Sequence, residues 1–311
     1  MSLGFIADLH NHTTASDGEY TPAELVFKAR ELGLAAVGVT DHDTLEGLDA
    51  ALAAGEEAGI LVVPGVEVSL RFRRDYFVGT LHYLLYIPYT LLADDEFRRM
   101  AAEIFNQGRG AGLVRARVAA INAEFGPQGQ TPLLERELTP AEIEALAPNV
   151  TRRHFALALK QNHGLDREQI NRLIGNDSRA YVPSGIDPAQ LTPLLKHYPQ
   201  LVRVFAHPAA GSFPGESLYN EVLPPIEVVD VLMPEFLDED LLGLDGLEVA
   251  YPGHAPQHRA LMAQWAERYG LMQTGGSDCH DRVERPLGVA GVGQAELDAL
   301  LARLGTPEIN V

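Results

Sequence analysis

Hydrophobic and polar positions alternate along the first ninety residues with two distinct periods. Short apolar runs predict strands at residues 5–9, 36–40, 60–68 and 82–87. Between them, helical spacing extends from Thr21 to about Gly33 and over residues 45–58. Thr21, Pro22 and Glu24 form a capping box with proline at the first helical position. This order of elements predicts a parallel sheet with helices outside it.

From about residue 94 to residue 177 the pattern changes to helices alone. They are predicted at residues 95–125, 139–146, 151–163 and 166–174, with turns at Gly126-Pro127 and Pro148-Asn149. Strands then return at 201–206, 246–250 and 271–275, with a helix at 255–269. The simplest architecture is an α/β barrel or sheet that a helical insertion interrupts. We predict a discontinuous barrel domain at residues 4–95 and 180–311 and a helical cap at 96–179.

The charge distribution limits the partners. The net charge is −19, and a surface this acidic would repel a long nucleic acid. Residues 98–180 nevertheless carry twelve Lys/Arg against nine Asp/Glu, so this stretch is +3 and the rest is −22. It is either a set of solvated helix faces or a segment that meets an anionic substrate. No apolar run reaches the ~18–20 residues of a membrane span. A start without signal-peptide character and the single Cys279 favour the reducing cytoplasm.

Histidines and carboxylates follow the predicted strands. The nine candidates are His10, His12, Asp17, His42, Glu67, His82, His207, Asp278 and His280. His10 and His12 stand two apart, so an extended chain points both to one face, and Asp278 and His280 repeat this spacing. The carboxyl ends of parallel strands form the functional rim of α/β folds. These residues are therefore expected to converge on one metal centre.

The chemistry of the candidate ligands limits which metal ions the site would bind. Nitrogen and oxygen ligands without thiolate favour Mn²⁺, Fe²⁺ or Zn²⁺. Nine ligands are too many for one ion and suit two or three, with one carboxylate bridging. Clustered ions roughly 3.5–4 Å apart activate water and neutralise phosphoryl charge in phosphoester hydrolysis. The sequence therefore predicts a phosphoester hydrolase with two or three divalent ions, Mn²⁺ favoured.

Five short motifs resemble those of the polymerase and histidinol phosphatase (PHP) family of the amidohydrolase superfamily, and they occur in the same order. They are His10-x-His12, Thr40-Asp41-His42, Gly65-Val66-Glu67, Ala206-His207-Pro208 and Ser277-Asp278-x-His280. The resemblance covers about residues 5–90 and 190–290. It implies a distorted (β/α)₇ barrel with a trinuclear centre.

The resemblance also implies a division of the ligands among three ions. One ion would take His10, His12, Glu67 and Asp278. A second would share Glu67 and add His82 and His207. The third would take Asp17, His42 and His280.

The insertion resembles that of PHP proteins that dephosphorylate nucleoside 3′,5′-bisphosphates or trim RNA from its 5′ end. Residues 151–156 (Thr-Arg-Arg-His-Phe-Ala) and 181–183 (Tyr-Val-Pro) carry this resemblance. Arg152, Arg179 and His154 are candidates for gripping a second phosphate, because a guanidinium fork matches phosphate geometry. The alternative for each is an ordinary helix-surface arginine or a satisfied histidine.

His254 is a candidate general acid for the leaving alkoxide, or a phosphate ligand, whereas Glu67 and Asp278 hold the metals. Asp41 and Asp43 are candidates for orienting His42, with helix capping an alternative for Asp43. His163 and His197 are expected to be solvated helix residues, and His258 is expected to be structural.

These observations favour hydrolysis of a phosphomonoester on a small nucleotide. The preferred substrate is a 3′,5′-bisphosphate (pAp), which gives AMP and phosphate through water activated on the metals. Three alternatives stay open: a 5′→3′ exoribonuclease on short RNA, a histidinol phosphatase, and a metal-binding module without activity.

Overall fold

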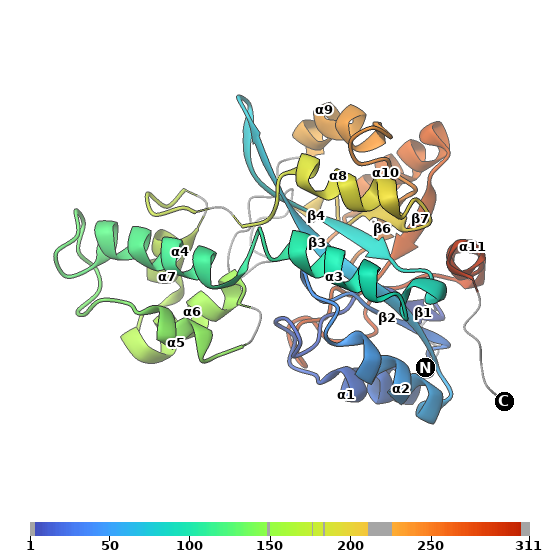
Figure 1. The fold of residues 1–311 in the computed structure, drawn as a ribbon, viewed down its shortest axis with the longest axis horizontal. Helices are drawn as coiled ribbons and strands as arrows, with labels where there is room; N and C mark the ends of the chain where they lie inside the picture. Colours follow the sequence, from blue (N-terminus) through green and yellow to red (C-terminus); the bar gives the residue numbers. More distant parts are fainter. Residues whose placement is uncertain (1–3, 148–149, 176, 183, 211–225, 306–311) are drawn as a thin grey trace.

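The computed structural model describes residues 4–147, 150–175, 177–182, 184–210 and 226–305 (Figure 1). The predicted turn at Pro148-Asn149 lies outside these residues, as does Pro183 of the insertion motif. Among the helices of the described ranges, none combines the length and the hydropathy needed to cross a bilayer.

Seven strands form one sheet in chain order. They are β1 (Ala7–Asp8), β2 (Ala36–Val39), β3 (Leu61–Arg74), β4 (Phe77–Tyr86), β5 (Val202–Phe205), β6 (Gly246–Ala250) and β7 (Met272–Gly275). The chain just after β1 meets the chain just after β7. The Leu9 N–H donates to the Gly275 carbonyl (3.1 Å), and the Asp278 N–H donates to the His10 carbonyl (2.9 Å). The sheet therefore curls into a nearly closed barrel, and the predicted distorted (β/α)₇ fold is confirmed.

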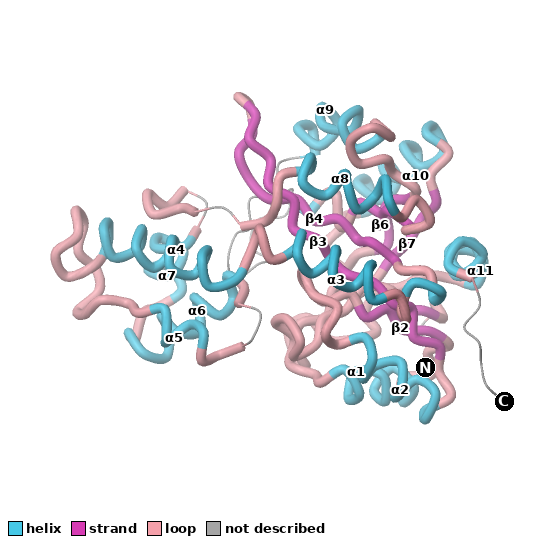
Figure 2. Tube along the Cα trace, in the orientation of Figure 1, coloured by secondary structure: helices cyan, strands magenta, loops and turns pink. Residues whose placement is uncertain are grey.

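One strand breaks the parallel order. β4 runs antiparallel to both β3 and β5, whereas all other neighbours are parallel. The prediction of an all-parallel sheet is therefore wrong. Only Asp75 and Tyr76 connect β3 to β4, and a link this short permits only an antiparallel hairpin. β3 also extends to Arg74, and the hairpin projects beyond the barrel (Figure 2).

Helices cover the outside of the barrel (Figure 1). They are α1 (Pro22–Glu31), α2 (Leu48–Ala58), a 3₁₀ turn η1 (Tyr89–Leu91), α8 (Pro188–His197), α9 (Ile226–Leu237), α10 (Pro256–Tyr269) and α11 (Gln294–Leu304). The capping box of α1 is confirmed: the Glu24 N–H donates to Thr21 Oγ1 (3.2 Å), and Glu24 Oε2 accepts from the Thr21 N–H (2.9 Å). Helices α8, α9 and α11 were not predicted. α2 begins three residues later than predicted, after a turn in which the Leu48 N–H donates to the Leu45 carbonyl.

The insertion contains α4 (Gly110–Phe125), α5 (Pro140–Glu144), α6 (Arg152–His163) and α7 (Arg167–Ile174). These helices bury an apolar cluster of their own, which includes Ile121, Phe155 and Leu173. By contrast, Phe97 and Phe105 of α3 (Asp95–Phe105) belong to the barrel core. The domain boundaries given above stay a prediction.

The predicted single helix at 95–125 is wrong, because the chain breaks between α3 and α4. Arg109 is extended (φ −140°, ψ −162°) and Gly110 has a φ of 80°, so the chain leaves the helical path at these two residues. Gly108 next to them packs closely on Gly185, where a Cβ would lie 2.5 Å from the carbonyl carbon. Inside the barrel, a separate apolar cluster includes Leu9, Val63 and Leu300 of α11. The barrel is therefore packed, and its polar chemistry gathers at the rim.

Candidate metal centre

All nine predicted residues come together at one end of the barrel. His10 and His12 follow β1, His42 follows β2, His207 follows β5, and Asp278 and His280 follow β7. Glu67 and His82 instead lie within strands, because β3 and β4 continue past the rim. His82 is paired in register with Ser69, two residues beyond Glu67. The antiparallel hairpin of β3 and β4 thus brings the middle of β4 to the site.

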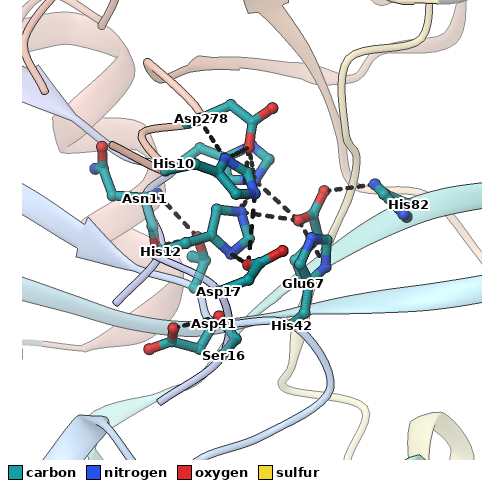
Figure 3. A network of polar contacts seen from close by, with 12 residues as sticks. His10, Asn11, His12, Ser16, Asp17, Asp41, His42, Glu67, His82 and Asp278 are labelled. Carbon is teal, nitrogen blue, oxygen red and sulfur yellow. Dashed lines mark hydrogen bonds and ion pairs between the residues drawn. The ribbon is translucent and has the colours of Figure 1, made fainter. Parts of the chain in front are cut away.

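The first cluster consists of His10, His12, Glu67 and Asp278 (Figure 3). Nε2 of His12 lies 3.0 Å from Oε2 of Glu67 and 3.1 Å from Oδ1 of Asp278. Nε2 of His10 lies 3.2 Å from the same Glu67 oxygen and 3.6 Å from the same Asp278 oxygen. Two ring nitrogens and two carboxylate oxygens therefore face one small volume. This set equals the one that the family resemblance implies for the first ion.

The other oxygen of Glu67 faces a second group. Its Oε1 lies 3.0 Å from Nδ1 of His82 and 3.0 Å from Nε2 of His207, and these nitrogens are 3.4 Å apart. His42 Nδ1 approaches Glu67 Oε2 at 3.1 Å. Glu67 is therefore placed as a bridging carboxylate, with one oxygen toward each neighbouring group.

The third cluster consists of His12, Asp17, His42 and His280. Oδ1 of Asp17 lies 3.5 Å from Nε2 of His280 and 3.8 Å from Nδ1 of His12. His12 thus offers one ring nitrogen to each of two clusters. The family resemblance did not imply this second use of His12.

Several buried atoms of the clusters lack hydrogen bonds within the described residues. They are Oε2 of Glu67, Oδ1 of Asp278, Oδ1 of Asp17 and Nδ1 of His12. Buried acceptors without donors cost free energy, and divalent cations would satisfy all of them. The donor set is nitrogen and oxygen only, as expected for Mn²⁺, Fe²⁺ or Zn²⁺. The residues therefore fit divalent metal ions.

Protonation is strongly perturbed in this cluster. Burial opposes protonation of His12, but the Asp278 and Glu67 carboxylates beside its ring outweigh this effect and raise its pKa to about 10. Burial also disfavours the Glu67 and Asp278 carboxylates, yet the surrounding histidines hold the pKa of each well below its usual range. A divalent ion, when bound, would displace the proton from His12.

Glu248 supports the cluster from behind and was not predicted. Its side chain is completely buried, and its oxygens lie 3.0 and 3.2 Å from Nδ1 of His10. One of these oxygens also accepts the His207 N–H (2.8 Å). A carboxylate behind a metal-binding histidine fixes the orientation of the ring and raises its basicity. The sequence does carry a signal for this residue, because Glu248 is the one charged residue in the otherwise apolar strand 246–250.

Backbone strain marks the same positions. His207 and Asp278 have φ angles of 31° and 50°, which are uncommon for residues other than glycine. Hydrogen bonds hold both: the His207 N–H to Glu248, and the Asp278 N–H to the His10 carbonyl. Asp278 Oδ2 also accepts from Nη1 of Arg285 (2.9 Å). These hydrogen bonds thus hold His207 and Asp278 in an uncommon backbone conformation that directs their side chains toward the cluster.

The carboxylates beside His42 organise neighbouring loops. Asp41 accepts from the Thr13 N–H (2.7 Å), the Thr13 hydroxyl (2.7 Å) and the Ser16 hydroxyl (2.6 Å), so it shapes the loop before Asp17. The Asp43 carboxylate accepts the Ser69 N–H (2.8 Å) and forms an ion pair with Arg109. It therefore pairs with these two residues rather than with the first turn of a helix.

The predicted phosphate-binding residues of the insertion are placed differently from one another. Arg152 is buried, with its guanidinium 5.4 Å from the Tyr181 ring centroid. His154 is also buried, and its Nδ1 accepts the Thr151 N–H (2.9 Å). Burial lowers the pKa of His154, and the negative charge of Asp17 opposes this shift. Arg179 is largely exposed and lies 3.7 Å from Glu124. Arg152 and His154 are therefore buried within the protein, whereas Arg179 faces solvent.

His254 is buried, with both ring nitrogens engaged. Nδ1 lies 3.0 Å from the Val249 carbonyl, and Nε2 accepts the Ala209 N–H (3.4 Å). Burial lowers its pKa to about 3. A neutral imidazole with this pattern carries its proton on Nδ1, turned toward the backbone. Its roles as general acid and phosphate ligand stay predictions. The prediction of a solvated His163 is wrong, because its side chain is buried and lies 3.5 Å from Glu142, whereas His197 is exposed and packs against Tyr198.

Comparison with known proteins decides the family. The profile of the PHP domain matches residues 8–205. The chain belongs to the PHP domain family. Among solved structures, a putative metal-dependent phosphoesterase from Bifidobacterium adolescentis is similar at a TM-score of 0.73 and 27% identity, and the match covers 99% of each chain. The protein is therefore a metal-dependent PHP phosphoesterase.

Curated PHP relatives span several substrates. A 5′-3′ exoribonuclease of Haemophilus influenzae is 28% identical over 88% of this chain and 89% of its own. A phosphoribosyl 1,2-cyclic phosphate 1,2-diphosphodiesterase of Eggerthella lenta is 28% identical over 90% and 96%. A 3′,5′-nucleoside bisphosphate phosphatase of Chromobacterium violaceum is 26% identical over 88% and 86%. These similarities leave the substrate of this PHP protein open.

Proposed function

We propose that this PHP protein is a phosphatase for small nucleotides. It hydrolyses one phosphomonoester of a nucleoside 3′,5′-bisphosphate, pAp preferred, to give AMP and phosphate. The nine clustered residues hold two or three divalent ions, with Mn²⁺ favoured. The name of the Chromobacterium violaceum relative agrees with this substrate class.

The observation that carries the proposal is the contact between the start of α6 and the rim of the metal centre. Arg153 lies 3.6 Å from Glu19 and 3.8 Å from Asp281, whose loops carry Asp17 and His280. The next residue, His154, interacts electrostatically with Asp17. A basic segment thus meets the edge of the centre in an otherwise acidic protein. A small substrate with a second phosphate needs basic residues beside the metal centre to bind that phosphate, whereas an aryl phosphate does not.

The protein groups have distinct tasks in this mechanism. Divalent ions, when bound, would activate water and neutralise charge on the phosphoryl oxygens. Glu67 and Asp278 hold them, and Glu248 keeps the His10 ring in place. Arg152 would bind the phosphate that is not cleaved. His254 would protonate the leaving oxygen only after releasing one of its present hydrogen bonds.

A panel of phosphate esters with Mn²⁺ tests the proposal. It should include pAp, AMP, histidinol phosphate, a ribose cyclic phosphate and p-nitrophenyl phosphate. We expect kcat/KM for pAp to exceed the value for the aryl ester at least tenfold. Equal values for the two would refute the substrate assignment while leaving the phosphoesterase assignment intact.

The second candidate is 5′→3′ trimming of short RNA, favoured by the name of the Haemophilus influenzae relative. The same centre can serve a diester, and net charge −19 opposes long polymers more than short ones. Oligonucleotides of two to five residues with a 5′-phosphate would test it. A kcat/KM that rivals the value for pAp would favour this candidate.

A further inference from the structure

The chain enters and leaves the insertion through two segments that touch. The Gly185 N–H donates to the Gly108 carbonyl (3.1 Å), and the space between the two glycines excludes a Cβ on Gly108. Arg109 follows directly, between the end of α3 and the start of α4. Its side chain is buried even though it sits on a connecting segment. Burying a guanidinium costs free energy unless the group is paired, and Arg109 is paired.

Both partners of Arg109 belong to the barrel rim. Its guanidinium forms an ion pair with Asp43 and donates from Nη2 to the Ser69 hydroxyl (2.9 Å). The Ser69 N–H donates to the other oxygen of Asp43 (2.8 Å). The Ser69 carbonyl accepts the N–H of Ile186 (3.0 Å), in the returning segment. One hub of Arg109, Asp43 and Ser69 therefore ties both connections of the insertion to the loop after β2.

Asp43 in turn fixes the backbone of two candidate metal ligands. It follows His42 directly, and its N–H donates to the carbonyl of Glu67 (3.0 Å). The main chain of His42 forms an isolated parallel β-bridge with that of Glu67. Asp43 has a φ of 49°, a conformation that persists in a non-glycine residue only where its surroundings hold it. The ion pair with Arg109 is one of the contacts that hold it.

We propose that Arg109 is a positioning residue that links the two connecting segments of the insertion to the His42 side of the metal centre. It acts through Asp43, which sets the direction of His42 in the cluster of His12, Asp17, His42 and His280. This inference rests on the proposed role of that cluster in binding metal. Loss of Arg109 leaves the buried Asp43 carboxylate without its counter-charge, so the loop that carries His42 relaxes.

The test measures metal binding without substrate, by titrating Mn²⁺ against a competing chelator. Arg109→Ala should weaken one ion of the set about tenfold or more, the size typical of residues that support metal ligands, and leave the others unchanged. Arg109→Lys keeps a charge beside Asp43 and should restore part of the affinity. Arg98→Ala is the matched control, because Arg98 on α3 pairs with the exposed Asp49 at the surface. It should change nothing.

Turnover and a second variant complete the test. For p-nitrophenyl phosphate, kcat should fall with the lost ion while KM changes little. Asp43→Asn keeps the side-chain shape and should lose the same ion, and the double variant should lose no more than the larger single loss. Unchanged metal binding, or equal weakening of every ion, would overturn the proposal. Because no substrate enters the titration, a wrong nucleotide assignment would leave this result readable.

Discussion

Glu248→Gln removes one charge from behind the metal centre and keeps the volume of the side chain. Glu248 accepts from the His207 N–H and engages Nδ1 of His10 with both oxygens. A glutamine has only one acceptor oxygen, so its amide N–H groups must face one of these two donors. One charge-assisted hydrogen bond is therefore lost.

The magnitude follows from that count. A hydrogen bond to a charged group contributes about 1.5–3 kcal/mol, which corresponds to roughly 10- to 100-fold in an equilibrium constant. Loss of the carboxylate also removes the strongest influence that raises the pKa of His10 against the effect of burial, so the imidazole becomes a weaker donor to a metal. We expect the affinity for Mn²⁺ to fall roughly 10- to 100-fold, with kcat falling in parallel at limiting metal.

The assay is a chelator competition titration, followed by turnover over a range of Mn²⁺ concentrations. Glu239→Gln makes the same charge change at an exposed carboxylate that pairs with Arg203, and it should leave metal affinity unchanged. Excess Mn²⁺ should restore most of the activity of Glu248→Gln. If Glu248→Gln binds Mn²⁺ as tightly as the wild type, Glu248 does not support His10 in the way inferred above.

Three further predictions concern the centre and the insertion. His12→Ala should lose more than one bound ion and reduce kcat at least ~10³-fold, because His12 belongs to two clusters; loss of a single ion, counted by metal analysis, would refute this. The Tm of the metal-free protein should fall as pH rises from 7 to 10. The pKa of His12 is about 10 in the folded protein and near 6.5 in the unfolded chain, so the stabilisation that is fully present below pH 6.5 is lost as His12 deprotonates. A Tm that stays constant over this range would contradict the prediction. Arg152→Ala should lower kcat/KM for pAp roughly 10- to 100-fold and for p-nitrophenyl phosphate much less; equal losses would mean that Arg152, which stacks on Tyr181, supports the fold instead.

The nine clustered residues could be predicted because strand ends combine two local signals. Histidine and carboxylate are chemically distinctive, and spacings of two, as in His10 and His12, define a face without knowledge of the fold. The order of the strands then brings them together. The same reasoning missed Glu248, because a ligand's supporting residue has no motif of its own.

The remaining differences come from contacts between distant segments. The turn at Asp75 and Tyr76 lacks the glycine or proline that usually marks a hairpin, so the antiparallel direction of β4 was not apparent. At the break between α3 and α4, Gly108 meets Gly185, which lies far along the chain. Helical periodicity is a local property and cannot report such a meeting.

The backbone bonds that join the start of the barrel to its end have a consequence for synthesis of the protein. His10 and Asp278 are joined through their own main-chain groups, so the ring of strands closes in the same place where the metal ligands meet. A nascent chain that has not yet released Asp278 and His280 from the ribosome can offer His10, His12 and Glu67 but cannot complete the centre. The first cluster is therefore complete only after the last strand has emerged, whereas Glu67, His82 and His207 of the second group are available earlier.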